Sequence, residues 1–285
     1  MSCRRPVVAF LSSGRCGTQW LTATLRELYG DVVEVEHEPV GPLYNPRRHF
    51  RRWDRPDAIL EAPVVARHLQ RIARSGHYVE TGWPIFAAVP LLAERFPDRV
   101  RLVHLTRHPV PSALSHLAHS SYAGSPRDDE YTRMATLGPG DPNVFHPEYA
   151  ERWDRLTPYE RCLFWWTEVH LFALEAETRL RDVPFLRVKA EDMLAGDERT
   201  LSRLNAHLEL PDDGRLAART DRLVDRWHHR TDLSVDFLQV SYHPATARLA
   251  KRLGYSIDDL DADALRARYA GQPDAGLDRI GRSFG

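Results

Sequence analysis

Residues 7–20 read VVAFLSSGRCGTQW, and this stretch decides the fold. Its first five residues, Val7 to Leu11, are all apolar, which is typical of a short buried strand. The turn-forming residues SSG follow, and large apolar side chains then recur at helical spacing over residues 18–29. The stretch therefore predicts a strand, a tight loop and a helix in direct succession.

The same alternation continues through the first two-thirds of the chain. Further strands are predicted at 32–36, 77–81, 100–106 and 184–188, and further helices at 58–74, 84–95, 158–181 and 198–208. Pro63 and Pro90 are expected to kink or shorten two of these helices, because proline has no N–H to donate inside a helix. Strands and helices in this order indicate a three-layer α/β fold, with a central parallel sheet of about five strands flanked by helices.

No linker divides the chain, so we predict one domain over residues 1–285. The stretch 122–157 is rich in Gly, Pro, Asp and Tyr and shows no apolar periodicity. Loops of this length in compact domains are commonly functional. We expect this one to form a lid on the substrate side.

Composition narrows the class of protein. The chain has 39 Lys+Arg against 40 Asp+Glu, a formal net charge of −1 and 42% hydrophobic residues, as in a soluble globular protein and unlike an overall basic nucleic-acid binder. Its three cysteines form no CxxC pair, which argues against a disulfide framework or a zinc knuckle. With no stretch long enough for a signal-peptide core or a membrane span, we expect a cytoplasmic, bacterial protein.

The loop at residues 12–18 is a candidate anion site. It joins a buried strand to a helix N-terminus, where free N–H groups and the helix dipole favour negative charge. Gly14 and Gly17 let the backbone approach a phosphate closely, Thr18 adds a hydroxyl, and Arg15 adds a forked cation. The alternative is an ordinary glycine-rich turn. Gly17 stands where nucleoside triphosphatases have the Lys before Ser/Thr, so an ATP or GTP hydrolase is disfavoured.

Residues 15–20, RCGTQW, resemble the phosphosulfate loop of sulfotransferases that use 3'-phosphoadenosine 5'-phosphosulfate. The loop of that family commonly reads KSGTTW or RSGTT. The resemblance places Arg15 at the cation position and Trp20 where cytosolic members stack on adenine, whereas Cys16 and Gln19 depart from the common Ser and Thr. It implies a P-loop-like fold and a donor-binding loop made of Ser13, Gly14, Arg15, Cys16, Gly17, Thr18, Gln19 and Trp20.

A second signature of that family is a strand that ends in Arg, followed eight residues later by Ser on the next helix. Here Arg107 ends the strand predicted at 100–106, and Ser115 follows at that spacing. Two such residues can converge on one anion at the carboxyl edge of a parallel sheet. The resemblance assigns them to the 3'-phosphate, with Ser112 as the rival hydroxyl. The alternative is a surface arginine and a packing serine.

The candidates for the general base lie where the strand at 32–36 ends. Sulfuryl transfer needs the acceptor to lose a proton as it attacks, together with donors on the transferring group. Carbohydrate-type sulfotransferases place a catalytic Glu after their second strand, close to Glu38 here, so Glu38 is our first choice. His37 is the second, since its ordinary pKa suits the role. Arg15 is the cation that would stabilise the transferring group. A solvated strand end is the alternative for these residues.

Four other groups of residues can be explained by a structural role as well as by a functional one. Glu80 and Thr81 point to the same sheet edge, either in the pocket or in structural hydrogen bonds. Trp165 and Trp166 are expected in the core rather than beside a substrate. No Cys, Asp or Glu completes a metal site with His116 and His119, so we predict none. Five clustered arginines are expected on a solvated face, or alternatively to bind an anionic acceptor or nucleic acid: Arg47, Arg48, Arg51, Arg52 and Arg55.

The sequence thus predicts an enzyme that moves a sulfuryl group from 3'-phosphoadenosine 5'-phosphosulfate, its co-substrate, to a hydroxyl or amine of a small-molecule or carbohydrate acceptor, without a metal. Two alternatives stay open at this point. One is a small-molecule kinase that uses the same loop for ATP. The other is a nucleotide-binding regulatory protein without catalysis.

Overall fold

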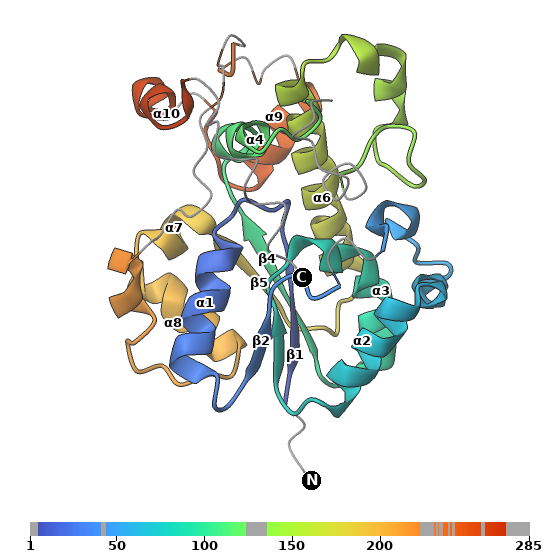
Figure 1. Ribbon diagram of the computed structural model, residues 1–285, viewed down its shortest axis with the longest axis vertical. Helices are drawn as coiled ribbons and strands as arrows, with labels where there is room; N and C mark the ends of the chain where they lie inside the picture. Colours follow the sequence, from blue (N-terminus) through green and yellow to red (C-terminus); the bar gives the residue numbers. More distant parts are fainter. Residues whose placement is uncertain are drawn as a thin grey trace.

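A five-stranded parallel sheet forms the centre of the protein in the computed structural model, with the strands in the order β2-β3-β1-β4-β5 (Figure 1). This confirms the predicted fold class. The strands are β1 (Val7–Leu11), β2 (Glu34–Glu36), β3 (Tyr78–Glu80), β4 (Val100–Thr106) and β5 (Phe185–Lys189). The structure describes residues 5–40, 44–123, 136–222, 231, 233, 236–238, 240, 243–257 and 260–271.

The central strand β1 is buried on both of its faces. Val8 and Phe10 belong to one apolar cluster and Val7, Ala9 and Leu11 to another, because successive side chains of a strand point to opposite sides of the sheet. A strand covered on both faces needs apolar residues at every position. That is why this segment reads as an unbroken apolar run.

Helices cover both faces of the sheet (Figure 1). One face packs against α1 (Thr18–Tyr29), α7 (Ala190–Leu194) and α8 (Glu198–His207). The other packs against α2 (Pro63–Arg74), α3 (Val89–Arg95) and α6 (Pro158–Arg179). Beyond the carboxyl edge of the strands lie α4 (Pro109–Ala118), α9 (Pro244–Arg252) and α10 (Ala262–Tyr269).

Prolines set several of the helix boundaries. The helix predicted at 58–74 is divided into the 3₁₀ segment η3 (Pro56–Glu61) and α2, and Pro63 begins α2 after the extended residue Ala62. The helix predicted at 84–95 is likewise a 3₁₀ segment, η4 (Trp83–Ala88), followed by α3 with Pro90 in its first turn. Proline fits the first turn of a helix, where its missing N–H has no partner to lose.

The strand β2 is shorter than predicted at its amino end. The N–H groups of Val32 and Val33 both donate to the carbonyl of Tyr29, so these residues close the end of α1 instead of joining the sheet. The apolar pattern predicted Val32 to be a strand residue, but its side chain is 53% exposed.

Residues 136–157, which are most of the described part of the predicted lid, are fastened to the body of the protein. This stretch includes the 3₁₀ segment η5 (Pro147–Arg155). Asp141 accepts two hydrogen bonds, at 2.7 and 2.8 Å, from Arg47 of η2 (Pro46–His49). The carboxylate of Glu168, on α6, accepts from the N–H of Phe145 at 2.6 Å and contacts His146 Nδ1 at 2.7 Å. Residues 124–135 of the predicted lid lie outside the described residues.

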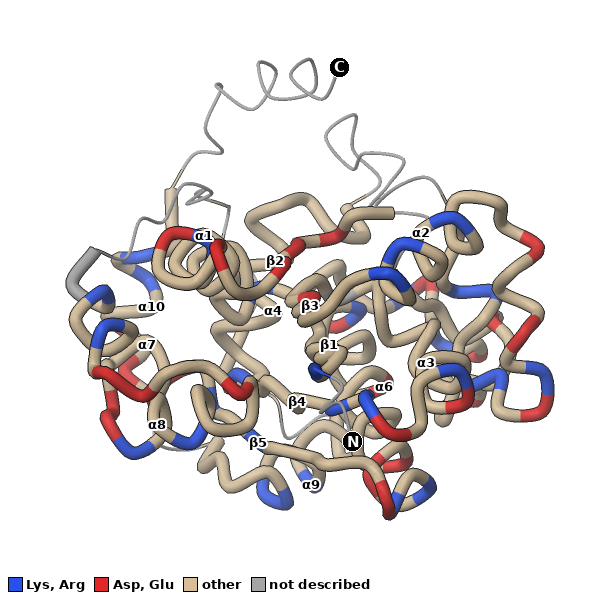
Figure 2. Tube along the Cα trace, turned by 90° about the horizontal axis from the view of Figure 1, so that it is seen from below, with Lys and Arg blue, Asp and Glu red and all other residues tan. Residues whose placement is uncertain are grey.

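Most of the clustered arginines engage nearby acids. Besides Arg47, Arg51 pairs with Glu175 at 2.6 Å, Arg52 lies 3.4 Å from Asp54, and Arg55 lies 3.9 Å from Glu61. Figure 2 shows basic and acidic residues intermixed along the helices on both sides of the sheet. Arg48 and Arg55 are exposed, as expected for a solvated face, whereas Arg47 and Arg51 are partly buried in ion pairs with acids 94 and 124 positions away in the chain. No helix among the described residues has the length and apolar character needed to cross a membrane.

Candidate functional site

The loop between β1 and α1 turns through three residues with positive φ. Gly14 has φ 81°, Arg15 58° and Gly17 81°, values in the left-handed region that glycine adopts at little cost. Arg15 is held there although it carries a side chain. A Cβ on Gly17 would also make a tight 3.0 Å approach to the end of the Leu194 side chain, on α7, so the positive φ is the main reason for glycine at this position.

No side chain among the described residues caps the amino end of α1. Its N-cap residue is Gly17, and its first turn has no acidic residue. The first N–H groups of a helix have no partner within the helix, and they carry the positive end of its dipole. An anion placed at this end would satisfy them.

Arg15 and the two residues of the second signature meet at this same place. The Nε of Arg15 donates to Ser115 Oγ at 3.0 Å, although the two residues are 100 positions apart. Arg107, directly after β4, donates to the carbonyl of Arg15 at 2.7 Å and to the hydroxyl of Tyr269 at 3.3 Å. Two guanidinium groups and a serine therefore lie beside the amino end of α1. Ser112 is fully buried, so the rival hydroxyl is enclosed in the core.

The positive charges of these arginines shift the pKa values of neighbouring side chains. Burial raises the pKa of the Tyr269 hydroxyl, but the charges of Arg107 and Arg268 outweigh it, and the pKa lies below its ordinary value. Burial, with the charge of Arg15 as a smaller cause, lowers the pKa of His116 to about 3. The site thus favours negative charge and disfavours a protonated imidazole.

The two residues that depart from the family's common loop sequence lie in different surroundings. Cys16 is fully buried, its Sγ donates to the carbonyl of Gly14 at 3.0 Å, and burial raises its pKa to about 12. It therefore stays a neutral thiol that braces the loop. Gln19 is exposed on α1. Trp20, the predicted adenine contact, is half-buried against the cluster on the α1 side of the sheet.

The two candidates for the general base lie next to each other after β2. His37 Nε2 lies 3.6 Å from Glu38 Oε1, and His37 Nδ1 lies 3.3 Å from Thr81 Oγ1. Thr81 in turn donates to the carbonyl of Thr18, in the first turn of α1, at 3.3 Å. This chain of contacts ties the end of β2 to the anion loop. Burial, followed by the charges of Arg26 and Arg15, lowers the pKa of His37 to about 4.

Glu38 has an unusual backbone conformation. Its φ is 52°, which is uncommon for a residue with a side chain and is typical of functional sites when the surroundings enforce it. Gly82 lies against this residue: a Cβ there would lie 2.5 Å from the backbone nitrogen of Glu38 and 2.6 Å from its Cγ. The close approach of these two segments therefore requires glycine at position 82.

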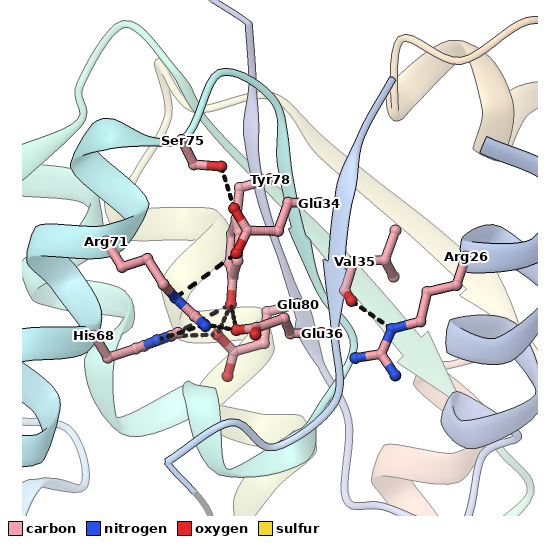
Figure 3. A network of polar contacts seen from close by, with 9 residues as sticks. All are labelled: Arg26, Glu34, Val35, Glu36, His68, Arg71, Ser75, Tyr78 and Glu80. Atoms are coloured by element: carbon pink, nitrogen blue, oxygen red, sulfur yellow. Dashed lines mark hydrogen bonds and ion pairs between the residues drawn. The ribbon is translucent and has the colours of Figure 1, made fainter. Parts of the chain in front are cut away.

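The other carboxylates at this sheet edge are engaged in a separate network (Figure 3). Glu80 is 2% exposed and contacts His68 Nε2 at 3.0 Å, and Glu36 forms an ion pair with Arg71 of α2. The hydroxyl of Tyr78 lies within 3.0 Å of both carboxylates. Glu80 thus has structural hydrogen bonds, and the network fastens β2 and β3 to α2. Thr81 is fully buried beneath the first turn of α1.

Trp165 and Trp166 are fully buried, as the core reading predicts, but their indole N–H groups reach the site. Trp165 donates to the carbonyl of Ser13 at 2.7 Å and Trp166 to that of Arg107 at 2.9 Å. His116 contacts the same Ser13 carbonyl, and Tyr269 holds Arg107. The sequence signals only apolar periodicity here, so it does not reveal these contacts.

No group of His, Cys, Asp and Glu within the described ranges could hold a metal ion. No protein-family model and no curated protein matches the chain. Solved structures do align with it over most of its length. Three of them are sulfotransferases or sulfotransferase domains, the family that the sequence resembles.

Three of these structures give the extent of the likeness. The sulfotransferase domain from the curacin biosynthetic pathway is 16% identical, with a TM-score of 0.49, over 88% of this chain and 98% of that one. The sulfotransferase domain of the Synechococcus PCC 7002 olefin synthase is 16% identical, with a TM-score of 0.48, over 90% and 98%. A sulfotransferase from Alicyclobacillus acidocaldarius is 17% identical, with a TM-score of 0.46, over 92% and 99%.

Proposed function

We propose that this protein is a sulfotransferase that moves a sulfuryl group from 3'-phosphoadenosine 5'-phosphosulfate to a hydroxyl or amine of a small-molecule or carbohydrate acceptor. One observation carries the proposal: Arg15, Arg107 and Ser115 gather at the uncapped amino end of α1. A donor with phosphate groups at both the 3' and 5' positions matches a site built from a helix end and two forked cations.

Each residue of the site then has a role in the transfer. The acceptor oxygen or nitrogen attacks sulfur and forms the new bond, while the bond from sulfur to the 5'-phosphate oxygen breaks. The acceptor proton goes to Glu38. Arg15 and the N–H groups at the start of α1 stabilise the charge that develops on the transferring group and the departing phosphate. Arg107 and Ser115 hold the 3'-phosphate.

His37 is better suited to support than to accept the proton. Burial lowers the pKa of His37 to about 4, so the imidazole has no advantage over a carboxylate as a proton acceptor, and it is already in contact with Thr81. We assign His37 to positioning Glu38, whose carboxylate lies 3.6 Å from it.

Removing the Arg107 side chain tests the donor site. Arg107→Ala is expected to lower the affinity for adenosine 3',5'-bisphosphate by about ten- to a hundredfold, because a charge-assisted contact to a partly buried phosphate is lost. Isothermal titration calorimetry measures the change.

Arg99 is the matched control, since it precedes the same strand at the opposite edge of the sheet. Like Arg107, it donates to backbone carbonyls, those of Arg5, Ser75 and Gly76. Arg99→Ala should leave the affinity unchanged. A folded Arg107→Ala protein that binds the bisphosphate as tightly as wild type would remove Arg107 from the donor site.

A further inference from the structure

The carbonyl group of Ser13, in the middle of the anion loop, is held by two side chains from outside the loop. Ser13 is fully buried, and its carbonyl oxygen accepts from Trp165 Nε1 at 2.7 Å and from His116 Nε2 at 2.8 Å. Trp165 lies on α6 and His116 on α4, two helices that adjoin beyond the sheet edge (Figure 1). A carbonyl oxygen has two lone pairs, and here both have a donor.

The peptide group that carries this carbonyl is one that could otherwise rotate. It joins Ser13 to Gly14, and glycine adopts positive and negative φ almost equally well. Its N–H donates to Ser12 Oγ at 3.2 Å, which is a longer bond than those made by the carbonyl. A rotated peptide would turn a carbonyl oxygen, the negative end of its dipole, towards a loop that has to attract an anion.

We propose that Trp165 and His116 are positioning residues of the anion loop: they hold the Ser13 carbonyl towards α4 and α6 and so preserve the loop's affinity for phosphate. The inference rests on the proposed function, because it concerns the site that binds the donor. It assigns a role in binding to two side chains that neither bind the anion themselves nor carry a positive charge.

The chemistry of both side chains suits this role. An indole N–H is a donor only, so Trp165 cannot reverse the polarity of its bond. The imidazole of His116 stays neutral because burial lowers its pKa, and a carbonyl partner requires its proton to be on Nε2. The two donors are therefore present throughout the neutral pH range.

Three substitutions separate this role from simple core packing. Trp165→Phe keeps an aromatic ring but removes the donor, His116→Leu removes the other donor and keeps apolar volume, and His116→Gln restores an N–H. The control is Tyr159→Phe, also on α6, which removes a buried 2.7 Å hydrogen bond to the carbonyl of Phe237. That bond makes no contact with the loop.

We expect Trp165→Phe and His116→Leu each to weaken the binding of adenosine 3',5'-bisphosphate by about tenfold, the effect of losing one of the two hydrogen bonds that hold the Ser13 carbonyl. His116→Gln should bind to within about threefold of wild type. Tyr159→Phe should bind as wild type does, although its melting temperature falls. Calorimetry and thermal unfolding of the same preparations give both readouts.

Variants that lose melting temperature but bind the bisphosphate as the control does would overturn the inference and leave Trp165 and His116 as core residues. If Trp165→Phe does not fold, the comparison of His116→Leu with His116→Gln decides. If the wild-type protein binds no bisphosphate, the proposed function fails. The same variants are then titrated with inorganic pyrophosphate, for which the inference predicts the same loss and the same recovery, and equal affinities would refute it.

Discussion

Glu38→Gln is expected to lower turnover by roughly a hundredfold or more while leaving the affinity for adenosine 3',5'-bisphosphate close to that of wild type. The substitution keeps the size of the side chain but removes its ability to accept a proton. A general base acts mainly in the transition state, so its loss appears in turnover rather than in donor binding. Steady-state kinetics with a sulfated reporter product, together with calorimetry, measure the two quantities separately.

His37→Asn is the companion variant and should have a milder effect. It preserves a polar contact towards Thr81 and leaves the carboxylate of Glu38 in place. If His37→Asn abolishes turnover and Glu38→Gln retains it, the base is His37, and the donor site is unaffected by that reversal.

The second large effect is a loss of stability in mild acid. Burial, the largest cause in each case, lowers the pKa to about 4 for His37 and about 3 for His116 and His170. In the unfolded chain these imidazoles take up protons near pH 6.5. Their stabilisation is therefore complete above pH 6.5 and is lost as the pH falls below it, because the unfolded state then binds more protons.

At pH 5.5 the three histidines together should cost about 4 kcal/mol of the free energy of unfolding, relative to pH 7.5. That is a large part of the roughly 5–15 kcal/mol typical of a folded domain. Urea unfolding at the two pH values measures it. Other histidines whose pKa is lowered by burial, among them His104 and His207, add to this difference, and His116→Gln should reduce it by about 1 kcal/mol. Equal free energies of unfolding at both pH values would show that these groups are not buried as described.

His146 has the opposite sign and offsets part of this difference. Its hydrogen bond to the buried carboxylate of Glu168 raises its pKa above the ordinary value. Its stabilisation is fully present below pH 6.5 and is lost as the pH rises through the folded-state pKa. Between pH 5.5 and pH 7.5 its contribution therefore runs against that of the histidines with lowered pKa, and unfolding at pH 6.5 as a third value separates the two.

Much of the fold could be predicted from periodicity alone. The strand Val7–Leu11 and the helix Thr18–Tyr29 have the predicted bounds, because an unbroken apolar run and a helical stripe are unambiguous patterns. Boundaries were less certain where a local interaction competes with the pattern. Val32 looks like a strand residue but closes the end of α1, and Pro63 begins a helix that the pattern starts earlier.

The site was predictable only in part. The loop sequence and the spacing of Arg107 and Ser115 identify residues that the fold brings together around Arg15. The contacts behind them depend on side chains far away in the chain: Trp165 is 152 residues from Ser13, and Tyr269 is 162 residues from Arg107. A sequence pattern does not show which residues so far apart in the chain come into contact in the fold. Gly82 is similar, since only the close approach of Glu38 shows why glycine is needed there.

The central claim is that the loop at the start of α1 binds a nucleotide with separate 3' and 5' phosphates, and nucleotide titration tests it most directly. Gly17 stands where nucleoside triphosphatases have lysine, and Arg107 and Ser115 supply a second place for phosphate. Calorimetry should show that adenosine 3',5'-bisphosphate binds without magnesium and more tightly than ATP does with magnesium. Tighter binding of magnesium ATP would contradict the sulfotransferase account and favour a kinase.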